Sequence, residues 1–99
     1  MTHPVTDELT VVCFDIGSDR RRYRVVRILK GYGVRVQESV FECWLLPMQL
    51  RQLQARLQPV INSDEDRIAF YRLTQKDVDS AKMLGRGKQP SSNPSSYCV

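Results

Sequence analysis

The first apolar segment of the chain is a continuous run rather than an alternating one. Residues 9–16 are rich in β-branched and aromatic side chains, and Gly17 follows them. A continuous apolar strand is typical of a central position in a sheet, where both faces are covered. We therefore predict that this strand lies in the middle of the sheet.

A helical period follows this strand. Ser18 or Asp19 can cap the helix. Apolar side chains then recur at i, i+3, i+4 and i+7, namely at Val25, Ile28, Leu29 and Tyr32. We expect Gly33 to end the helix, and the arginines of this segment to face mostly water.

Two strand-like segments come next, at residues 34–37 and 39–45. The polar pair Gln37 and Glu38 between them is compatible with a tight hairpin or with a single bent strand. Pro47 suits the first turn of a second helix, whose apolar stripe is Leu50, Leu53, Leu57 and Ile61. Pro59 is expected to distort or end that helix.

The order of the predicted elements indicates the fold class. A polar cluster at residues 62–66 precedes a fourth strand at residues 67–73. The resulting order, β-α-β-β-α-β, matches an α+β, ferredoxin-like plan with an antiparallel sheet and both helices on one face. The other face of this sheet needs a cover, which a homodimer would provide.

The C-terminal part of the chain divides into an edge strand and a tail. Residues 81–84 are expected to form a short additional strand that pairs along an edge, either in this sheet or in that of another subunit. From residue 89 onward the chain is mostly Ser, Pro and Asn, a composition that does not form a core. We therefore predict a domain at residues 1–88 and a flexible tail at residues 89–99.

Composition narrows the class of protein. The chain has 99 residues, enough for one domain, and a formal net charge of +4, which favours polyanion partners without excluding an ordinary soluble protein. Its three cysteines are an odd number without a Cys/His cluster, so we expect reduced thiols in a cytoplasmic protein. No apolar run approaches the ~20 residues of a membrane-spanning helix, so we predict no membrane partner.

The best candidate for chemistry is Asp15, at the carboxyl end of the first strand. His3 is the one histidine, so histidine-based acid–base catalysis and zinc chemistry are not expected. The remaining hydrolytic mechanism is Mg²⁺-activated water, and a twofold axis near Asp15 would supply a second carboxylate. The alternative is that Asp15 only satisfies backbone donors at a turn.

A basic helix follows this aspartate. Arg20, Arg24 and Arg27 fall at i, i+4 and i+7, so one stripe of the helix can face a phosphate backbone. Arg22 lies at another azimuth, closer to Asp15. A solvated helix face is the alternative reading of the same arginines.

The segment FDIGSDRRRYRVVRILKGYGVRVQESVFE, together with the late LGRG, resembles the small CRISPR-associated spacer-acquisition nucleases. The resemblance covers residues 11–88 and combines a strand aspartate, a basic helix and the R-V-Q-x-S-V-F-E motif. It implies a ferredoxin-like homodimer whose last strand crosses to the partner. It also implies work with the family's larger integrase in capturing and inserting foreign DNA, and metal-dependent endonuclease activity in some members.

The resemblance also implies roles for individual residues. Asp15 matches the metal-binding aspartate of the family, while Arg22, Arg24 and Arg35 match basic positions associated with nucleic-acid contact. Phe41 matches an aromatic that is structural or dimer-related. Phe14 stands where many relatives carry tyrosine, so any role for that hydroxyl is absent here.

Two functions follow as hypotheses. The first is a dimeric Mg²⁺-dependent endonuclease of CRISPR adaptation, a phosphodiesterase acting on RNA or DNA with Asp15 as its catalytic carboxylate. The second is a non-catalytic dimeric scaffold that binds duplex DNA through charge and bridges integrase subunits. Both use the basic residues Arg20, Arg22, Arg24, Arg27 and Arg35 to hold nucleic acid.

Overall fold

The sheet is built around its first strand, β1 (Glu8–Asp15). A computed structural model describes residues 8–85 of the chain. β1 pairs in antiparallel fashion with β3 (Val40–Leu45) on one side and with β4 (Arg67–Leu73) on the other. β2 (Val34–Gln37) completes the strand order β2-β3-β1-β4 at an edge. The predicted interior position of the continuous apolar strand is confirmed.

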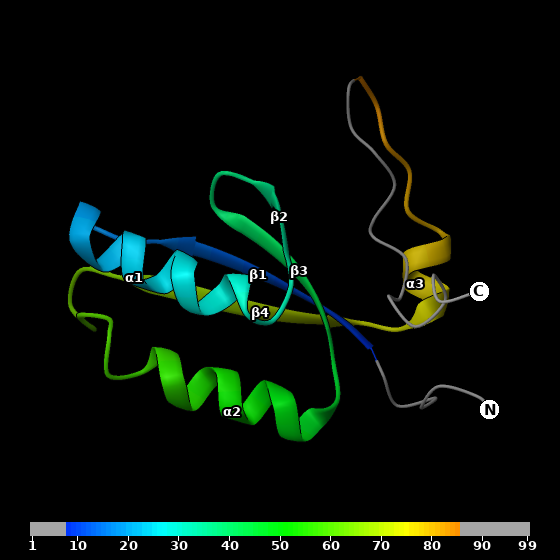
Figure 1. Cartoon of the computed structure of the whole chain (residues 1–99). Coiled ribbons are helices and arrows are strands. Elements are labelled where there is room, and N and C mark those ends of the chain that lie inside the picture. Colours follow the sequence, from blue (N-terminus) through cyan, green and yellow to red (C-terminus); the bar gives the residue numbers. More distant parts are fainter. Residues whose placement is uncertain (1–7, 86–99) are drawn as a thin grey trace.

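Both long helices lie on the same face of this sheet (Figure 1). They are α1 (Asp19–Lys30) and α2 (Pro47–Leu57). The core between the layers contains Val12, Phe41, Leu29 and Leu53, all fully buried. The order of elements, the antiparallel sheet and the one-sided helix layer together confirm the predicted ferredoxin-like α+β arrangement.

The segment between the helices is a hairpin, so the bent-strand alternative is wrong. β2 and β3 pair in antiparallel fashion, with Gln37 opposite Val40 across a short turn. The register shifts between Arg35 and Gln37, as at a β-bulge. A bulge is compatible with the exposed edge position of β2, because no further strand in the described chain has to match its register.

Helix α1 begins as predicted and ends earlier than predicted. The Ser18 hydroxyl accepts a hydrogen bond from the backbone N–H of Arg21, which is an N-cap. The helix ends at Lys30, and Gly31 is its C-cap, so Gly33 does not end it. Gly33 instead lies against β3, where a side-chain carbon would come within 2.9 Å of Cys43 Cα and closer still to the Glu42 carbonyl.

The start and end of α2 agree with the prediction. Pro47 occupies its first turn, and the Gln49 side chain accepts a hydrogen bond from the Leu46 backbone N–H at 2.8 Å. The helix ends at Leu57, two residues before Pro59. Gln58 keeps helical backbone angles as the C-cap, and the helix stops because Pro59 has no backbone N–H to continue the hydrogen-bond series.

The chain after β4 differs from the prediction. A short helix that the sequence did not predict, α3 (Gln75–Asp79), follows a capping box in which Thr74 and Asp77 bond each other's backbone N–H groups. Residues 81–84, expected to form a strand, pair with no strand in the described chain. The capping box turns the chain away from β4, so these residues do not reach an edge of their own sheet. Pairing with another subunit stays a prediction.

Several expectations concern residues outside 8–85. The domain boundary at residue 88, the tail at residues 89–99, His3 and Cys98 all lie beyond the described part. Cys13 and Cys43, which lie within it, are free thiols, and burial raises the pKa of Cys43 to about 11. Among the described helices, none is long and apolar enough to cross a membrane.

Candidate functional site

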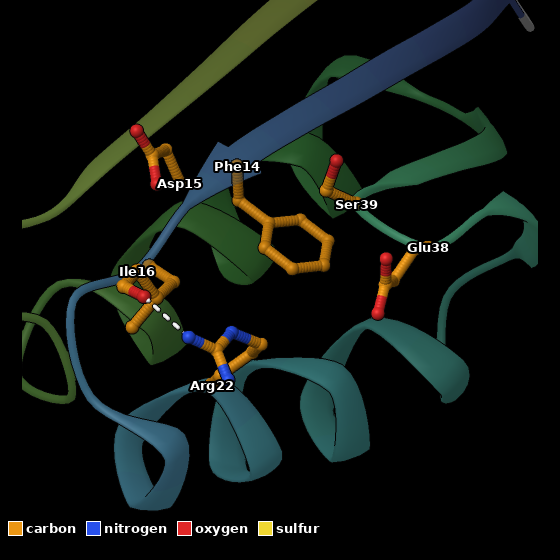
Figure 2. Close-up of a pocket in the computed structure, with 6 residues that line it drawn as sticks. All are labelled: Phe14, Asp15, Ile16, Arg22, Glu38 and Ser39. Carbon is orange, nitrogen blue, oxygen red and sulfur yellow. Dashed lines mark hydrogen bonds between the residues drawn. The ribbon is translucent and has the colours of Figure 1, made fainter.

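Asp15 lies on the sheet face that carries no long helix. Side chains alternate along a strand, so Val12 and Phe14 are buried toward the helices while Cys13 and Asp15 project from the opposite face. Figure 2 shows Phe14 and Asp15 leaving β1 on opposite sides. The Asp15 side chain is exposed, and no described residue forms a hydrogen bond or ion pair with its carboxylate. It is therefore available to a ligand.

A different carboxylate holds the turn that follows Asp15. Asp66, in the loop before β4, accepts hydrogen bonds from the backbone N–H of Gly17 at 2.9 Å and of Asn62 at 2.8 Å. It also accepts one from Arg21 Nε at 2.7 Å. The Arg21 hydrogen bond, with help from the two backbone donors, holds the pKa of Asp66 well below its ordinary value.

This arrangement answers the alternative reading of Asp15. Two backbone donors of the β1–α1 turn bond other side chains, the Gly17 N–H to Asp66 and the Arg21 N–H to Ser18, and none is bonded to Asp15 among the described residues. Asp15 therefore takes no part in capping or in the turn. The Asp66 contacts fix the position at which β1 ends and so fix where the Asp15 carboxylate leaves the sheet.

Arg22 is the predicted basic residue that shares a cavity with Asp15. The cavity has a volume of about 510 Å³ and is lined by Phe14, Asp15, Ile16, Arg22, Glu38 and Ser39. Arg22 donates from Nη2 to the Ile16 carbonyl at 2.8 Å and pairs with Asp19. Its guanidinium is thus held beside the end of β1 (Figure 2).

Glu38 brings a second carboxylate to the same cavity, but not to Asp15. The two carboxylates point in different directions in Figure 2, with that of Glu38 directed toward α1. Within residues 8–85 there is no group of three or more His, Cys, Asp and Glu side chains that could share a metal ion. Mg²⁺ usually binds through one or two carboxylates, waters and substrate phosphates. Asp15 fits such a site when a second chain or a substrate supplies the remaining oxygens.

Arg35 is engaged at the rim of this region. Its Nε donates to the Glu38 carbonyl at 3.0 Å, and Nη2 donates to the same oxygen. The turn is also tied to β1, because the Phe14 backbone N–H donates to the Ser39 carbonyl at 3.1 Å. Arg35 therefore stabilises the hairpin turn next to the cavity and does not line it.

The remaining predicted arginines lie elsewhere. Arg20, Arg24 and Arg27 are exposed, in agreement with a stripe that faces solvent. Arg24 and Arg27 line a separate hollow in the helix layer, together with Arg56 from α2. The structure thus separates this stripe from the sheet face that carries Asp15.

Sequence reasoning missed Arg67, the first residue of β4. It lies directly opposite Asp15 in the β1–β4 register. A hollow of about 290 Å³ on this face is lined by Cys13, Phe14, Asp15, Arg67, Ala69 and Tyr71. The predicted topology carried the signal, because in an antiparallel pair the start of the last strand lies beside the end of the first.

Comparison with known proteins assigns the family. Residues 8–81 match the family model described as CRISPR associated protein Cas2. The chain belongs to the CRISPR-associated Cas2 family. It is 45% identical over 75 residues to a CRISPR-associated endoribonuclease Cas2 of Synechocystis, a match that covers 71% of this chain and 82% of the relative.

Solved structures agree with this assignment. A hypothetical protein, TT1823 from Thermus thermophilus, superposes with a TM-score of 0.76 at 34% identity, covering 86% of this chain and 99% of the other. A chain of a partial Cas6-RT-Cas1–Cas2 complex superposes with a TM-score of 0.74 at 31% identity, covering 87% and 99%. The family resemblance that the sequence motifs indicated is confirmed.

Proposed function

We propose that this protein is a metal-dependent endonuclease of CRISPR adaptation that acts as a homodimer together with a CRISPR integrase. The observation that carries the proposal is the free, exposed carboxylate of Asp15, which shares one cavity with Arg22 and a hollow of the open sheet face with Arg67. The names of relatives support the activity, since Cas2 proteins of several organisms are called endoribonucleases. The Cas1–Cas2 assembly containing a similar chain supports the integrase partner.

The homodimer completes the metal site. The open face carries the half-buried apolar side chains Val11, Val40 and Trp44 and the exposed Tyr71, which no long helix of the described chain covers. A second copy packed on this face buries them and brings a second Asp15 toward the first. The segment after α3 leaves the domain (Figure 1), and its Leu84 is 94% exposed, which suits a strand added to the partner's sheet.

The proposed chemistry assigns one task to each charged group. The two Asp15 carboxylates would hold Mg²⁺, and the bound ion would supply a water of lowered pKa and polarise the phosphoryl oxygen. Arg67, opposite Asp15, holds the phosphate that is attacked, and Arg22 holds the adjoining backbone. Phe14 has no hydroxyl, so its ring contributes packing rather than proton transfer.

The test replaces the Asp15 carboxylate by an uncharged amide of nearly the same size and shape. Asp15→Asn should lower Mg²⁺-stimulated cleavage of end-labelled RNA or duplex DNA by at least about 100-fold, because a metal-binding group is lost. The matched control is Asp64→Asn, which alters an exposed aspartate in the loop before β4. Chelation by EDTA should abolish wild-type cleavage. Equal cleavage by wild type and Asp15→Asn would overturn the assignment.

A second function, the non-catalytic scaffold, is favoured by one feature of the fold. Arg24 and Arg27 lie in the helix layer, away from Asp15, so nucleic acid held by them is not at the metal site. The scaffold predicts that Asp15→Asn leaves duplex binding and integrase assembly unchanged, and that wild-type protein shows no Mg²⁺-dependent cleavage. The nuclease predicts cleavage that depends on Asp15.

Salt dependence tests whether either function involves nucleic acid. Each phosphate contact adds about 0.9 to the slope of log affinity against log salt. Binding of a mixed-sequence duplex that does not weaken with salt would contradict both functions and leave a protein interaction module. The proposal also includes a cytoplasmic location and no membrane partner, as expected from the sequence.

A further inference from the structure

We propose that the groove between α1 and α2 is a second contact for a phosphodiester backbone, formed by Arg24 and Arg27 of α1 and Arg56 of α2. This inference rests on the proposed function in so far as the protein binds nucleic acid. It adds a binding surface in the helix layer, and it adds Arg56, which lies outside the basic stripe of α1.

The groove brings three guanidinium groups around one hollow. The hollow has a volume of about 330 Å³ and is lined by Arg24, Arg27, Ile28 and Arg56. Arg24 and Arg27 are one helical turn apart on α1, and Arg56 comes from the last turn of α2. The groups therefore converge through helix packing rather than through adjacency in the chain.

Aromatic rings help to position two of these groups. The Arg56 guanidinium carbon lies 5.8 Å from the centroid of the Tyr32 ring, and Arg56 Nη1 is 3.5 Å from the Tyr32 hydroxyl oxygen. The Arg27 guanidinium carbon lies 5.9 Å from the centroid of the Tyr23 ring. Such cation–π contacts restrict the long side chains, so less conformational entropy is lost when a ligand binds.

The three arginines of the groove have no acidic partner within residues 8–85. None of the ion pairs found within residues 8–85 involves Arg24, Arg27 or Arg56. The negative end of a helix dipole favours Arg27 and Arg56, which lie in last turns, but it does not account for Arg24. Three positive charges around one hollow repel one another, and a bound anion would offset this repulsion. Phosphate suits this arrangement, because each guanidinium presents two parallel donors to its oxygens.

The location of the groove indicates what kind of phosphate compound it binds. It is open to solvent on the helix layer, opposite the sheet face that carries Asp15 and that the proposed dimer buries. A long polyanion can therefore lie along it without entering the metal site. Each copy of the dimer would present one groove on its outer surface, so we infer a nucleic-acid backbone as the ligand rather than a small phosphate compound.

The experiment measures duplex binding by fluorescence anisotropy over a range of KCl concentrations. Arg56→Gln should weaken binding and lower the salt slope by about 1, since one phosphate contact is lost. The matched control is Arg51→Gln, because Arg51 is also exposed on α2 but does not line the hollow. Its slope should equal that of wild type. Arg24→Gln is a second groove variant, and Arg56→Lys should retain most of the slope.

The outcomes separate this inference from the proposed function. A salt-dependent wild type with equal slopes for Arg56→Gln and Arg51→Gln would overturn the groove and leave nucleic-acid binding in place. Wild-type binding without salt dependence would overturn both. Competition by inorganic phosphate at concentrations far below those of the chloride would show a small-anion site instead and would also overturn the groove as a backbone contact. Thermal melting of each variant checks that the fold is intact.

Discussion

Asp66 leaves the Asp15 carboxylate available to a ligand. Its carboxylate accepts hydrogen bonds from the backbone N–H of Gly17 in the turn, from the backbone N–H of Asn62 in the loop and from the Arg21 guanidinium. The Gly17 N–H, a donor at the end of β1, is therefore bonded from the loop before β4 and not by Asp15. Asp15 is left exposed with its oxygens free for a metal or for solvent.

Asp66→Asn should destabilise the fold in a pH-dependent manner. The pKa of Asp66 is held below its ordinary value of 3.8, so its stabilising effect is complete above pH 3.8 and is lost as the pH falls through the lowered pKa. The difference in unfolding free energy between wild type and Asp66→Asn should be constant near neutral pH. It should shrink below pH 3.8. Urea unfolding at a series of pH values measures this difference.

A control for that experiment alters the other acid of the same loop. Glu65 also pairs with Arg21, at 3.0 Å, but its side chain is 60% exposed. Exposed ion pairs contribute little, so Glu65→Gln should change stability much less than Asp66→Asn. Equal effects of the two substitutions would mean that Asp66 does not hold the turn.

At the scale of elements, the sequence predicted the helix positions that depend on neighbouring residues alone. The 3.6-residue period predicted α1, Ser18 was one of its two predicted caps, and Pro47 and Pro59 bounded α2. The end of α1 was misassigned because Gly33 was interpreted as a C-cap. Its actual constraint is the close approach of β3, a tertiary contact that a helical pattern does not contain. Residues 81–84 were predicted as an edge strand, and an edge strand forms only where another strand pairs with it.

Gly33→Ala should destabilise the packing of the hairpin against α1. The added methyl group would overlap the Glu42 carbonyl and the Cys43 sulfur, and β3 backbone atoms cannot move aside easily. We expect a loss of about 1–3 kcal/mol, the usual range for overpacking, measured as a lower midpoint in thermal melting. The matched control is Gly31→Ala, because Gly31 has a φ of −79° and a new methyl group there would meet only the Ile28 carbonyl, at 3.4 Å. Equal melting of the two variants would contradict this role for Gly33.

At the scale of the whole molecule, the site residues that sequence reasoning missed depend on tertiary assembly. Arg67 reaches Asp15 through the β1–β4 register, and Arg56 reaches the α1 arginines through helix packing. Neither has a distinctive local motif. Asp15 and Arg22 were predictable because both lie within eight residues of one strand-to-helix turn. Arg24 and Arg27 were predicted as a basic stripe. Their separation from the Asp15 carboxylate was not predicted, because it follows from the sheet, which lies between the helix layer and the face from which Asp15 projects.

The open sheet face connects the fold to the proposed catalysis. If two copies meet there, a charge placed on this face should separate them and remove the second Asp15 from the metal site. Tyr71→Asp suits this test, because Tyr71 is 52% exposed in the described chain and its replacement leaves the core intact. An unpaired charge buried in an interface costs roughly 2–5 kcal/mol, so the dimer should weaken by about 100-fold or more.

Analytical ultracentrifugation and a cleavage assay on the same samples provide the readouts. Tyr71→Asp should sediment as a monomer and lose Mg²⁺-dependent cleavage although Asp15 is present. Met48→Asp is the matched control, since Met48 is 62% exposed on α2, away from this face, and its variant should remain dimeric and active. A monomeric Tyr71→Asp with full cleavage would mean that one chain binds the metal without a second subunit. A dimeric Tyr71→Asp would place the subunit interface on another surface.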